Sequence, residues 1–295
     1  MFLKRRWWRT LPNYYLFLLI LTVLALYQGS MSPPRSWVPY LFFLQNFTTP
    51  PETFFNVSWS LAVEEWFYLL LPFFVLCSGI FIKNRSTAFL AGVATMAFIS
   101  FLLRISLFDG FPWDEHARKI AIGRLDAMAW GCFIAWLKEL KPAWFERLAH
   151  PICATFFLTI SLLVSVIAFR NFPSSNTLIH PALLFSALPA SFAFCIPFFS
   201  KASFSFLPRW MAKVILLISL SSYSLYLCHM PIFNLSRHLT PEEAGLSVQL
   251  IFRGAGIVAA FLLSYLLYRY FESPLLRLRP KNPERTIIKS GLPVP

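Results

Sequence analysis

Long apolar runs are the feature that most restricts how this chain can fold. Each is close to the roughly 20 residues that an α-helix needs to cross the hydrocarbon core of a bilayer. The chain is 57% hydrophobic and only 13% charged, whereas soluble domains carry about 25% charged residues. A soluble fold of this length has too little interior for so much apolar surface. We therefore expect an all-α, polytopic transmembrane helix bundle with about eight spans. The expected spans cover residues 11–28, 60–82, 87–107, 123–137, 152–169, 179–199, 214–235 and 248–270.

Positive charge is distributed unevenly among the segments between these runs. With both termini placed in the cytoplasm, the segments on that side carry 18 of the 26 Lys and Arg residues, as the positive-inside rule requires. The net charge of +13 therefore indicates membrane orientation, and we expect no nucleic-acid partner. We expect one membrane domain over residues 1–280, followed by a cytoplasmic tail over residues 281–295.

The five cysteines show neither CxxC nor metal-ligand spacing. Each lies in or beside an apolar run, which is typical of small core residues. We therefore predict neither a disulfide framework nor a metal site.

Two adjacent carboxylates, Glu64 and Glu65, stand at the threshold of the apolar run that follows NVSWSLAV. Placing a charged side chain at membrane depth costs at least a few kcal/mol, so we expect these two residues to have a specific role. Ser60, Glu64 and Tyr68 are spaced i, i+4, i+8 and share one helix face. Glu65 points about 100° away, so it need not share the role of Glu64, and a structural role suits it better than a catalytic one.

Further polar residues are expected at the same depth as Glu64. In the predicted topology Arg104 ends the third span, Arg124 and Asp126 begin the fourth, and His229 lies in the outer half of the seventh. This convergence of four spans predicts a polar cavity that opens to the outside. A histidine beside a carboxylate is suited to general acid–base chemistry.

Each of these residues also has a plainer explanation. Glu64 fits the first turn of its helix, where the dipole favours a negative charge, or an ion pair with Arg104 or Arg124. Arg124 and Asp126 fit a helix-start ion pair. His229 fits a core histidine whose ring nitrogens are both hydrogen-bonded.

Several separated segments resemble the acyltransferase 3 family of membrane O-acyltransferases. The second of them is very similar to the family's most distinctive motif, with Trp66 where Gln is usual. The segments occur in the family's order and cover almost the whole chain. They are FLKRRWWRTLP at 2–12, SWSLAVEEWFY at 58–68, RLDAM at 124–128, SYSLYLCH at 222–229 and FESP at 271–274.

The resemblance implies transfer of an acyl group, often acetyl, from cytoplasmic acyl-CoA to a carbohydrate hydroxyl at the outer face of a bacterial inner membrane. Arg6 and Arg9 would then hold donor phosphates on the inside. A base would deprotonate the sugar hydroxyl, which attacks the thioester carbonyl. Glu64 would orient a catalytic histidine or the acceptor, and Arg124 would hold the acceptor or the oxyanion. The expected catalytic residues are Ser60, Glu64, Arg124, Asp126 and His229, and the expected substrate-binding residues are Trp59, Glu65, Tyr68 and Tyr226.

One departure from the family leaves a second function open. Family members usually carry two further spans before this region, and a histidine in the first of them is taken as central to catalysis. The present sequence opens where the third span of the family would begin. We therefore expect an N-terminally truncated O-acyltransferase or, as the alternative, a catalytically inactive membrane scaffold or remnant. A solute transporter is a weaker third possibility, since we find no matched pair of broken helices.

Overall fold

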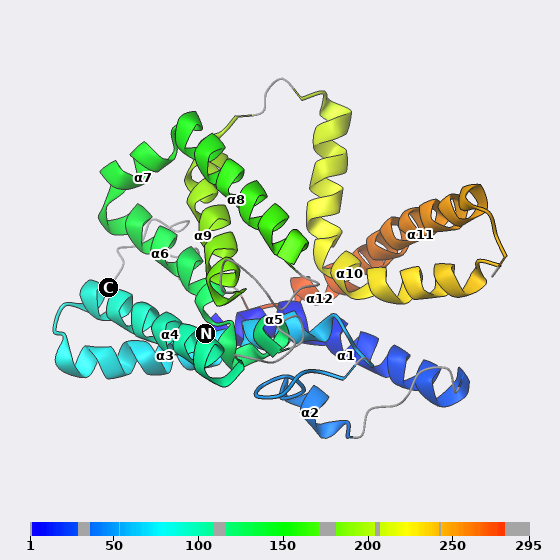
Figure 1. Cartoon of the computed structure of the whole chain (residues 1–295), viewed down its shortest axis with the longest axis horizontal. Coiled ribbons are helices and arrows are strands. Elements are labelled where there is room, and N and C mark those ends of the chain that lie inside the picture. The colour runs from blue at the N-terminus through cyan, green and yellow to red at the C-terminus, as the bar shows by residue number, and fades with distance from the viewer. Residues whose placement is uncertain are drawn as a thin grey trace. The chain divides into compact units, whose positions relative to one another are not determined.

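The computed structural model describes residues 2–28, 36–52, 54–108, 116–171, 181–203, 207–241 and 243–280. These ranges form helices and turns and contain no strand (Figure 1), which confirms the prediction of an all-α fold. The predicted tail at 281–295 lies outside the described residues. The chain divides into two compact units. The first unit consists of residues 1–35, 54–57 and 205–295, and the second unit consists of residues 36–53 and 58–204.

The first unit is built on three long helices. Helix α1 begins within the basic N-terminal segment and not at Leu11, so its arginines stand on a helix. Helices α10 and α11 follow one another through a short loop and pack together. A Cβ added to Gly256 of α11 would lie 3.0 Å from the Cβ of Ser236 of α10, so glycine permits this close approach. The elements are α1 (Phe2–Gln28), α10 (Arg209–Leu239), α11 (Leu246–Leu267), the π-helix η2 (Tyr268–Glu272) and α12 (Ser273–Arg277).

The second unit contains the remaining helices. Its centre is an apolar cluster to which α3, α4 and α6 each contribute, with Phe67, Met96 and Ala129 as members. The elements are α2 (Val38–Leu41), α3 (Ser58–Phe81), α4 (Arg85–Phe108), α5 (His116–Lys119), η1 (Ala121–Gly123), α6 (Asp126–Leu140), α7 (Pro142–Leu148), α8 (Pro151–Asn171) and α9 (Pro181–Lys201).

Six helices of the described ranges are long and apolar enough to cross a membrane, and a seventh span results if α7 and α8, bent by 67°, are counted together. Each predicted span corresponds to a helix, but α6 has only 15 residues. At 1.5 Å per residue it reaches about 22 Å, short of the roughly 30 Å of hydrocarbon. The span expected near 123–137 is therefore not among the candidates.

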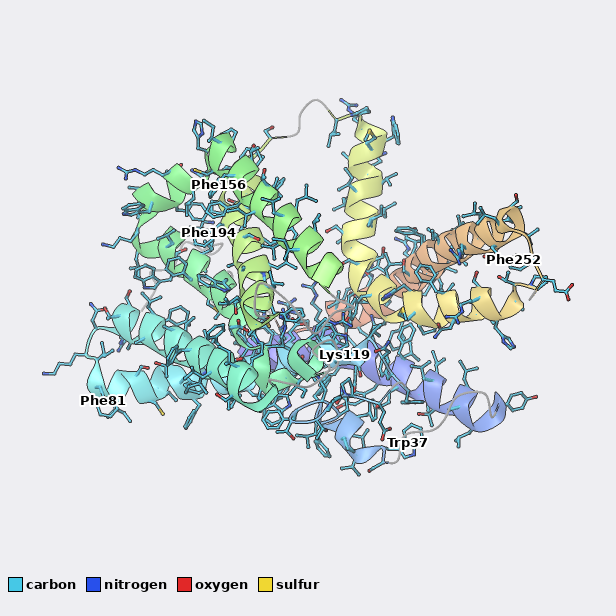
Figure 2. All side chains as sticks on the ribbon, viewed as in Figure 1. Trp37, Phe81, Lys119, Phe156, Phe194 and Phe252 are labelled. Carbon is cyan, nitrogen blue, oxygen red and sulfur yellow. The ribbon has the colours of Figure 1, made fainter. Side chains whose placement is uncertain are left out.

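The long helices expose much of their apolar surface. Phe81 at the end of α3 is 86% exposed and Phe156 of α8 is 58% exposed (both are labelled in Figure 2). Such exposure is unusual in a soluble monomer and is expected where lipid covers the helices. The structure therefore supports a multi-pass membrane protein.

The apolar segment near 37–47, which is too short to cross a bilayer, folds against α3. It forms α2 and a series of turns, with Phe43 in the left-handed backbone region at φ 58°. Trp66 donates from its indole nitrogen to the Phe43 carbonyl at 2.9 Å, and its ring lies 4.3 Å from that of Phe47. An interfacial or re-entrant position for this segment stays a prediction.

Candidate functional site

The start of α6 in the second unit carries a buried ion pair. Arg104 of α4, 1% exposed, pairs with Asp126, the first residue of α6. Its remaining N–H groups donate to the Gly123 carbonyl at 2.6 Å, to the Ala182 carbonyl at 2.8 Å and to the Ser186 hydroxyl at 3.1 Å. Ser186 in turn donates to the second Asp126 oxygen at 2.5 Å. This network ties α4, α6 and α9 together.

Arg124, the second predicted cation, takes a different position. It is half-buried, donates to the Phe185 carbonyl at 3.1 Å and holds its guanidinium carbon 4.9 Å above the Phe185 ring. Burial, and then the charge of Arg104, lower the pKa of Arg124 to about 10, so the group stays charged at neutral pH. The alternative of an ion pair between Arg124 and Asp126 is wrong, since the partner of Asp126 is Arg104. Among the described residues the Arg124 side chain makes one hydrogen bond, so its other N–H groups can donate to an anionic oxygen.

The helix face predicted for Ser60, Glu64 and Tyr68 belongs to α3. Tyr68 donates its hydroxyl to Glu64 Oε1 at 3.4 Å, as the i, i+4 spacing requires. Glu64 and Ser60 are half-buried, whereas Glu65 is only 3% exposed. The two adjacent carboxylates therefore have different surroundings, and Glu64 is the more accessible.

Gln45 and Asn46, which the sequence did not single out, support the start of α3. Both side chains are buried. Gln45 donates to the Ser58 hydroxyl at 3.2 Å, and Asn46 donates to the carbonyls of Trp59 and Lys119 at 2.9 and 2.6 Å. The sequence feature that could have indicated this role is the pair of adjacent amide side chains within an otherwise apolar run.

Three of the predicted span ends lie together in the second unit, whereas the polar cavity expected there stays a prediction. Arg118 of α5 lies 5.5 Å from the Trp59 ring at the start of α3. Ser100 of α4 donates to the Ile122 carbonyl of η1 at 2.8 Å. The start of α3, the end of α4 and the start of α6 thus share one region. His229 belongs to the first unit, and its convergence with these groups stays a prediction.

His229 has the geometry of a proton acceptor. Its Nδ1 lies 2.7 Å from the Tyr226 carbonyl, which can only accept, so Nδ1 carries the proton. In the neutral ring the lone pair is then on Nε2. Tyr226 itself is held by a hydrogen bond from its hydroxyl to the Val57 carbonyl at 2.8 Å. His229 lines a cavity of about 370 Å³ between α10 and α11, together with Ser222, Leu225, Tyr226, Phe233, Ile257, Ala260 and Phe261.

A buried polar network holds α10 to the rest of the first unit, and the sequence did not predict its members as site residues. Glu272, 4% exposed, accepts hydrogen bonds from Asn13 at 2.9 Å and Ser224 at 2.7 Å. Tyr223 donates to the Thr10 carbonyl at 2.8 Å. The segment SYSLYLCH therefore fastens α1, α10 and η2 together.

Four arginines gather where α1 begins and α12 ends. Burial, and then the charges of Arg5, Arg9 and Arg6, lower the pKa of Arg279. Within the described residues, Arg5 Nη1 and Arg279 Nε are buried without a hydrogen-bond partner. Such a cluster suits an anion with several phosphates. Arg6 and Arg9 were predicted for this role, whereas Arg279 was missed.

The described ranges contain no group of three His, Cys, Asp or Glu residues that could hold a metal ion. The prediction of a metal-free site stays a prediction.

Comparison with known proteins assigns the chain. The model of the acyltransferase 3 family, described as an acyltransferase domain, matches residues 1–269. The chain belongs to the acyltransferase 3 family. This is the family that the sequence resembled. No solved structure matches it.

One curated relative extends this family assignment. It is a protein of Bacillus subtilis (strain 168) named "Putative peptidoglycan O-acetyltransferase YrhL", 25% identical over 228 residues. The match covers 74% of this acyltransferase 3 chain and 34% of the relative, so it spans about a third of the relative's length.

Proposed function

We propose that this chain transfers an acyl group, preferentially acetyl, from acyl-CoA at the cytoplasmic face of a bacterial inner membrane to a carbohydrate hydroxyl at the outer face. The match to the acyltransferase family over residues 1–269 is the observation that carries this proposal. The name of the Bacillus relative supports acetyl as the group and a peptidoglycan-type carbohydrate as the acceptor.

The arginine cluster is the proposed donor site. Acyl-CoA carries several phosphates, and guanidinium groups bind phosphate oxygens in pairs. Arg5, Arg6 and Arg9 lie close enough to Arg279 for their charges to lower its pKa, and a bound polyanion relieves that repulsion. The excess of Lys and Arg in the predicted cytoplasmic segments supports an inward-facing position for this cluster.

The proposed reaction is direct transfer. A base takes the proton of the sugar hydroxyl, the oxygen attacks the thioester carbonyl, and the tetrahedral oxyanion collapses with release of the CoA thiolate, which takes up a proton. In the first unit His229 Nε2 is the candidate base, since Nδ1 is held by Tyr226. In the second unit Glu64, beside Tyr68, is the candidate for orienting the acceptor. Arg124, charged and largely unused, is the candidate for stabilising the oxyanion.

The test is acetyl transfer by the full chain in membranes supplied with labelled acetyl-CoA and a peptidoglycan-type glycan. His229→Gln and Glu64→Gln should each lower the rate, by about 10²–10⁴-fold for the residue that acts as the base. Ser60→Ala should cost less than Glu64→Gln. Glu139→Gln, on the exposed face of α6, is the matched control and should leave the rate unchanged. Unchanged rates in the His229 and Glu64 variants would remove both residues from the mechanism, and no transfer by the folded wild type would favour the inactive-scaffold alternative.

A further inference from the structure

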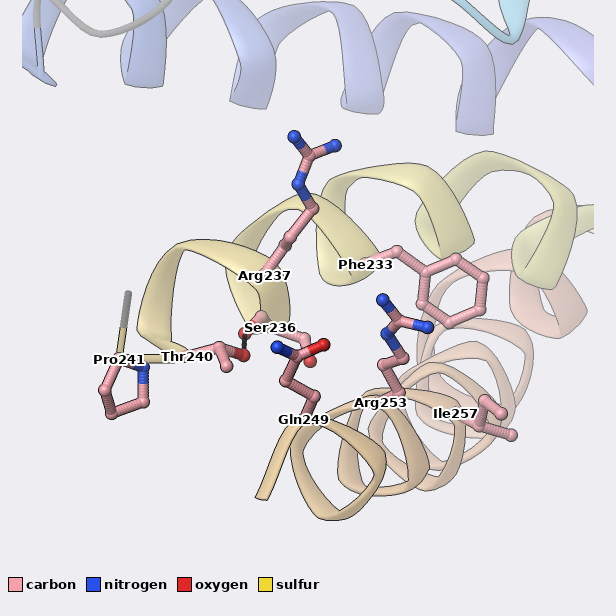
Figure 3. A pocket seen from close by; sticks show the side chains of 8 residues that line it. All are labelled: Phe233, Ser236, Arg237, Thr240, Pro241, Gln249, Arg253 and Ile257. Atoms are coloured by element: carbon pink, nitrogen blue, oxygen red, sulfur yellow. Dashed lines mark hydrogen bonds between the residues drawn. The ribbon is translucent and has the colours of Figure 1, made fainter. Parts of the chain in front are cut away.

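A cavity of about 750 Å³ lies where α10 ends and α11 begins (Figure 3), within the usual range for a small-molecule site. Gly256 holds the two helices close together just beside it. The cavity is polar toward the helix ends and apolar toward the helix centres. Its lining residues are Phe233, Ser236, Arg237, Thr240, Pro241, Gln249, Arg253 and Ile257.

Two guanidinium groups line the polar end, and neither has a hydrogen-bond or ion-pair partner for its side chain within the described part of the chain. Arg253 reaches from α11 toward Phe233, whereas Arg237 stands on the last turns of α10 with its guanidinium pointing away from Gln249 and Arg253 (Figure 3). The Gln249 amide donates to the Ala244 carbonyl at 3.0 Å, so its oxygen can accept from a hydroxyl. Among the lining residues that the structure describes there is no Asp or Glu. This end therefore favours an anion with several oxygens over a zwitterion, whose cationic part would find no counter-charge.

The apolar end continues along the helices. Phe233 and Ile257 also line the 370 Å³ cavity that contains His229, and the rest of that wall includes Ala260 and Phe261. Both helices belong to candidate membrane spans, Arg209–Leu239 and Leu246–Arg277. The arginines thus stand near the end of a span, where a lipid headgroup lies, and the apolar groove runs toward the middle of the span, where a lipid chain lies.

We propose that this joined cavity binds one anionic glycerophospholipid of the bilayer. Arg253 holds the phosphate, and the long side chain of Arg237 turns to bring a second guanidinium to it. Gln249 accepts from a headgroup hydroxyl, and one acyl chain lies past Phe233 and Ile257 toward His229. Such a lipid covers the cavity beside the candidate base. A link between lipid occupancy and transfer rate rests on the proposed function, whereas lipid binding does not.

The experiment measures lipid binding to the purified, delipidated full chain by native mass spectrometry. The probes are phosphatidylglycerol, phosphatidylcholine, a polyprenyl monophosphate and inorganic phosphate. The test variant Arg237→Gln with Arg253→Gln should bind phosphatidylglycerol at least about tenfold more weakly, because charge-assisted hydrogen bonds are lost. The control Arg209→Gln with Lys213→Gln removes the same charge from the other end of α10 and should bind as the wild type does. Phosphatidylcholine should bind the wild type at least about tenfold more weakly than phosphatidylglycerol.

A second variant tests the contribution of the apolar groove independently of the arginine charges. Ile257→Trp narrows the apolar groove and should weaken long-chain phosphatidylglycerol while leaving a dihexanoyl analogue unaffected. The proposal is overturned if the arginine variant binds phosphatidylglycerol as tightly as the wild type does, or if the polyprenyl monophosphate binds the wild type more tightly than phosphatidylglycerol does. It is also overturned if inorganic phosphate displaces phosphatidylglycerol when both are present at equal concentration. Lipid binding without acetyl transfer would contradict the proposed function and leave this inference intact.

Discussion

At the level of single residues, the buried pair of Arg104 and Asp126 has the character of a structural element. Removing two charges from water is costly unless each is paired and hydrogen-bonded, and here Gly123, Ala182 and Ser186 complete the bonds. Asp126 was expected to be catalytic. That role stays a prediction, and the contacts of Asp126 also suit a residue that fixes the start of α6 beside Arg124.

This assignment predicts a loss of stability on substitution. Asp126→Asn leaves the Arg104 charge buried and unpaired, and should lower the free energy of unfolding in detergent by about 3–5 kcal/mol. Ser186→Ala, which removes one neutral donor, should cost only about 1 kcal/mol. Normal stability with loss of activity in Asp126→Asn would return Asp126 to the catalytic group.

The arginine cluster predicts a change in donor kinetics. Arg9→Ala or Arg279→Ala should raise KM for acyl-CoA by about tenfold and leave KM for the glycan unchanged, because the lost contacts are with donor phosphates. Arg85→Ala, an exposed arginine at the start of α4 on the same predicted side, is the control. Equal effects on both KM values would argue against a donor site here.

Residue patterns predicted some of this site and missed the rest for a physical reason. The shared face of Ser60, Glu64 and Tyr68 followed from 3.6 residues per turn, because that relation lies within one helix. The partner of Asp126 did not follow, because Arg104 comes from another helix, and sequence proximity favoured Arg124. Pairings across helices depend on packing that no single segment specifies.

At the level of helices, the contact between α3 and α4 depends on one glycine. A Cβ at Gly92 would lie 2.8 Å from both Val75 Cα and Val75 N, so backbone would have to move. Gly92→Ala should therefore lower stability by about 1–3 kcal/mol. Gly79→Ala, where nothing lies within 4 Å, is the control and should cost nothing. Thermal unfolding of both variants in detergent measures this difference in stability. Equal unfolding midpoints would mean that α3 and α4 accommodate the added methyl group without cost.

Helix positions were predictable from hydropathy, whereas membrane crossing was not. Every predicted span appears as a helix. Yet α6 buries Ala129 and Ile134, and Leu125 and Ala129 pack with residues of α3 and α4. Its apolar residues therefore serve protein packing as well as any lipid contact, and hydropathy cannot distinguish the two uses. The start of α1 was likewise missed, because basic residues lower hydropathy without preventing helix formation.

At the level of the whole molecule, the family assignment and the apolar helices agree on a multi-pass membrane protein of the acyltransferase 3 family. The directional part of the proposal requires that donor and acceptor lie on opposite faces. The charge distribution supports cytoplasmic termini only if an even number of helices crosses the membrane.

The most direct measurement uses the full chain in sealed vesicles of known orientation, with labelled acetyl-CoA supplied only at the cytoplasmic face. Glycan is supplied on both sides and recovered separately. The account predicts O-acetyl label on the glycan of the opposite side, with the label lost in the His229→Gln variant. Label confined to the donor side, or no label from folded protein, would contradict it.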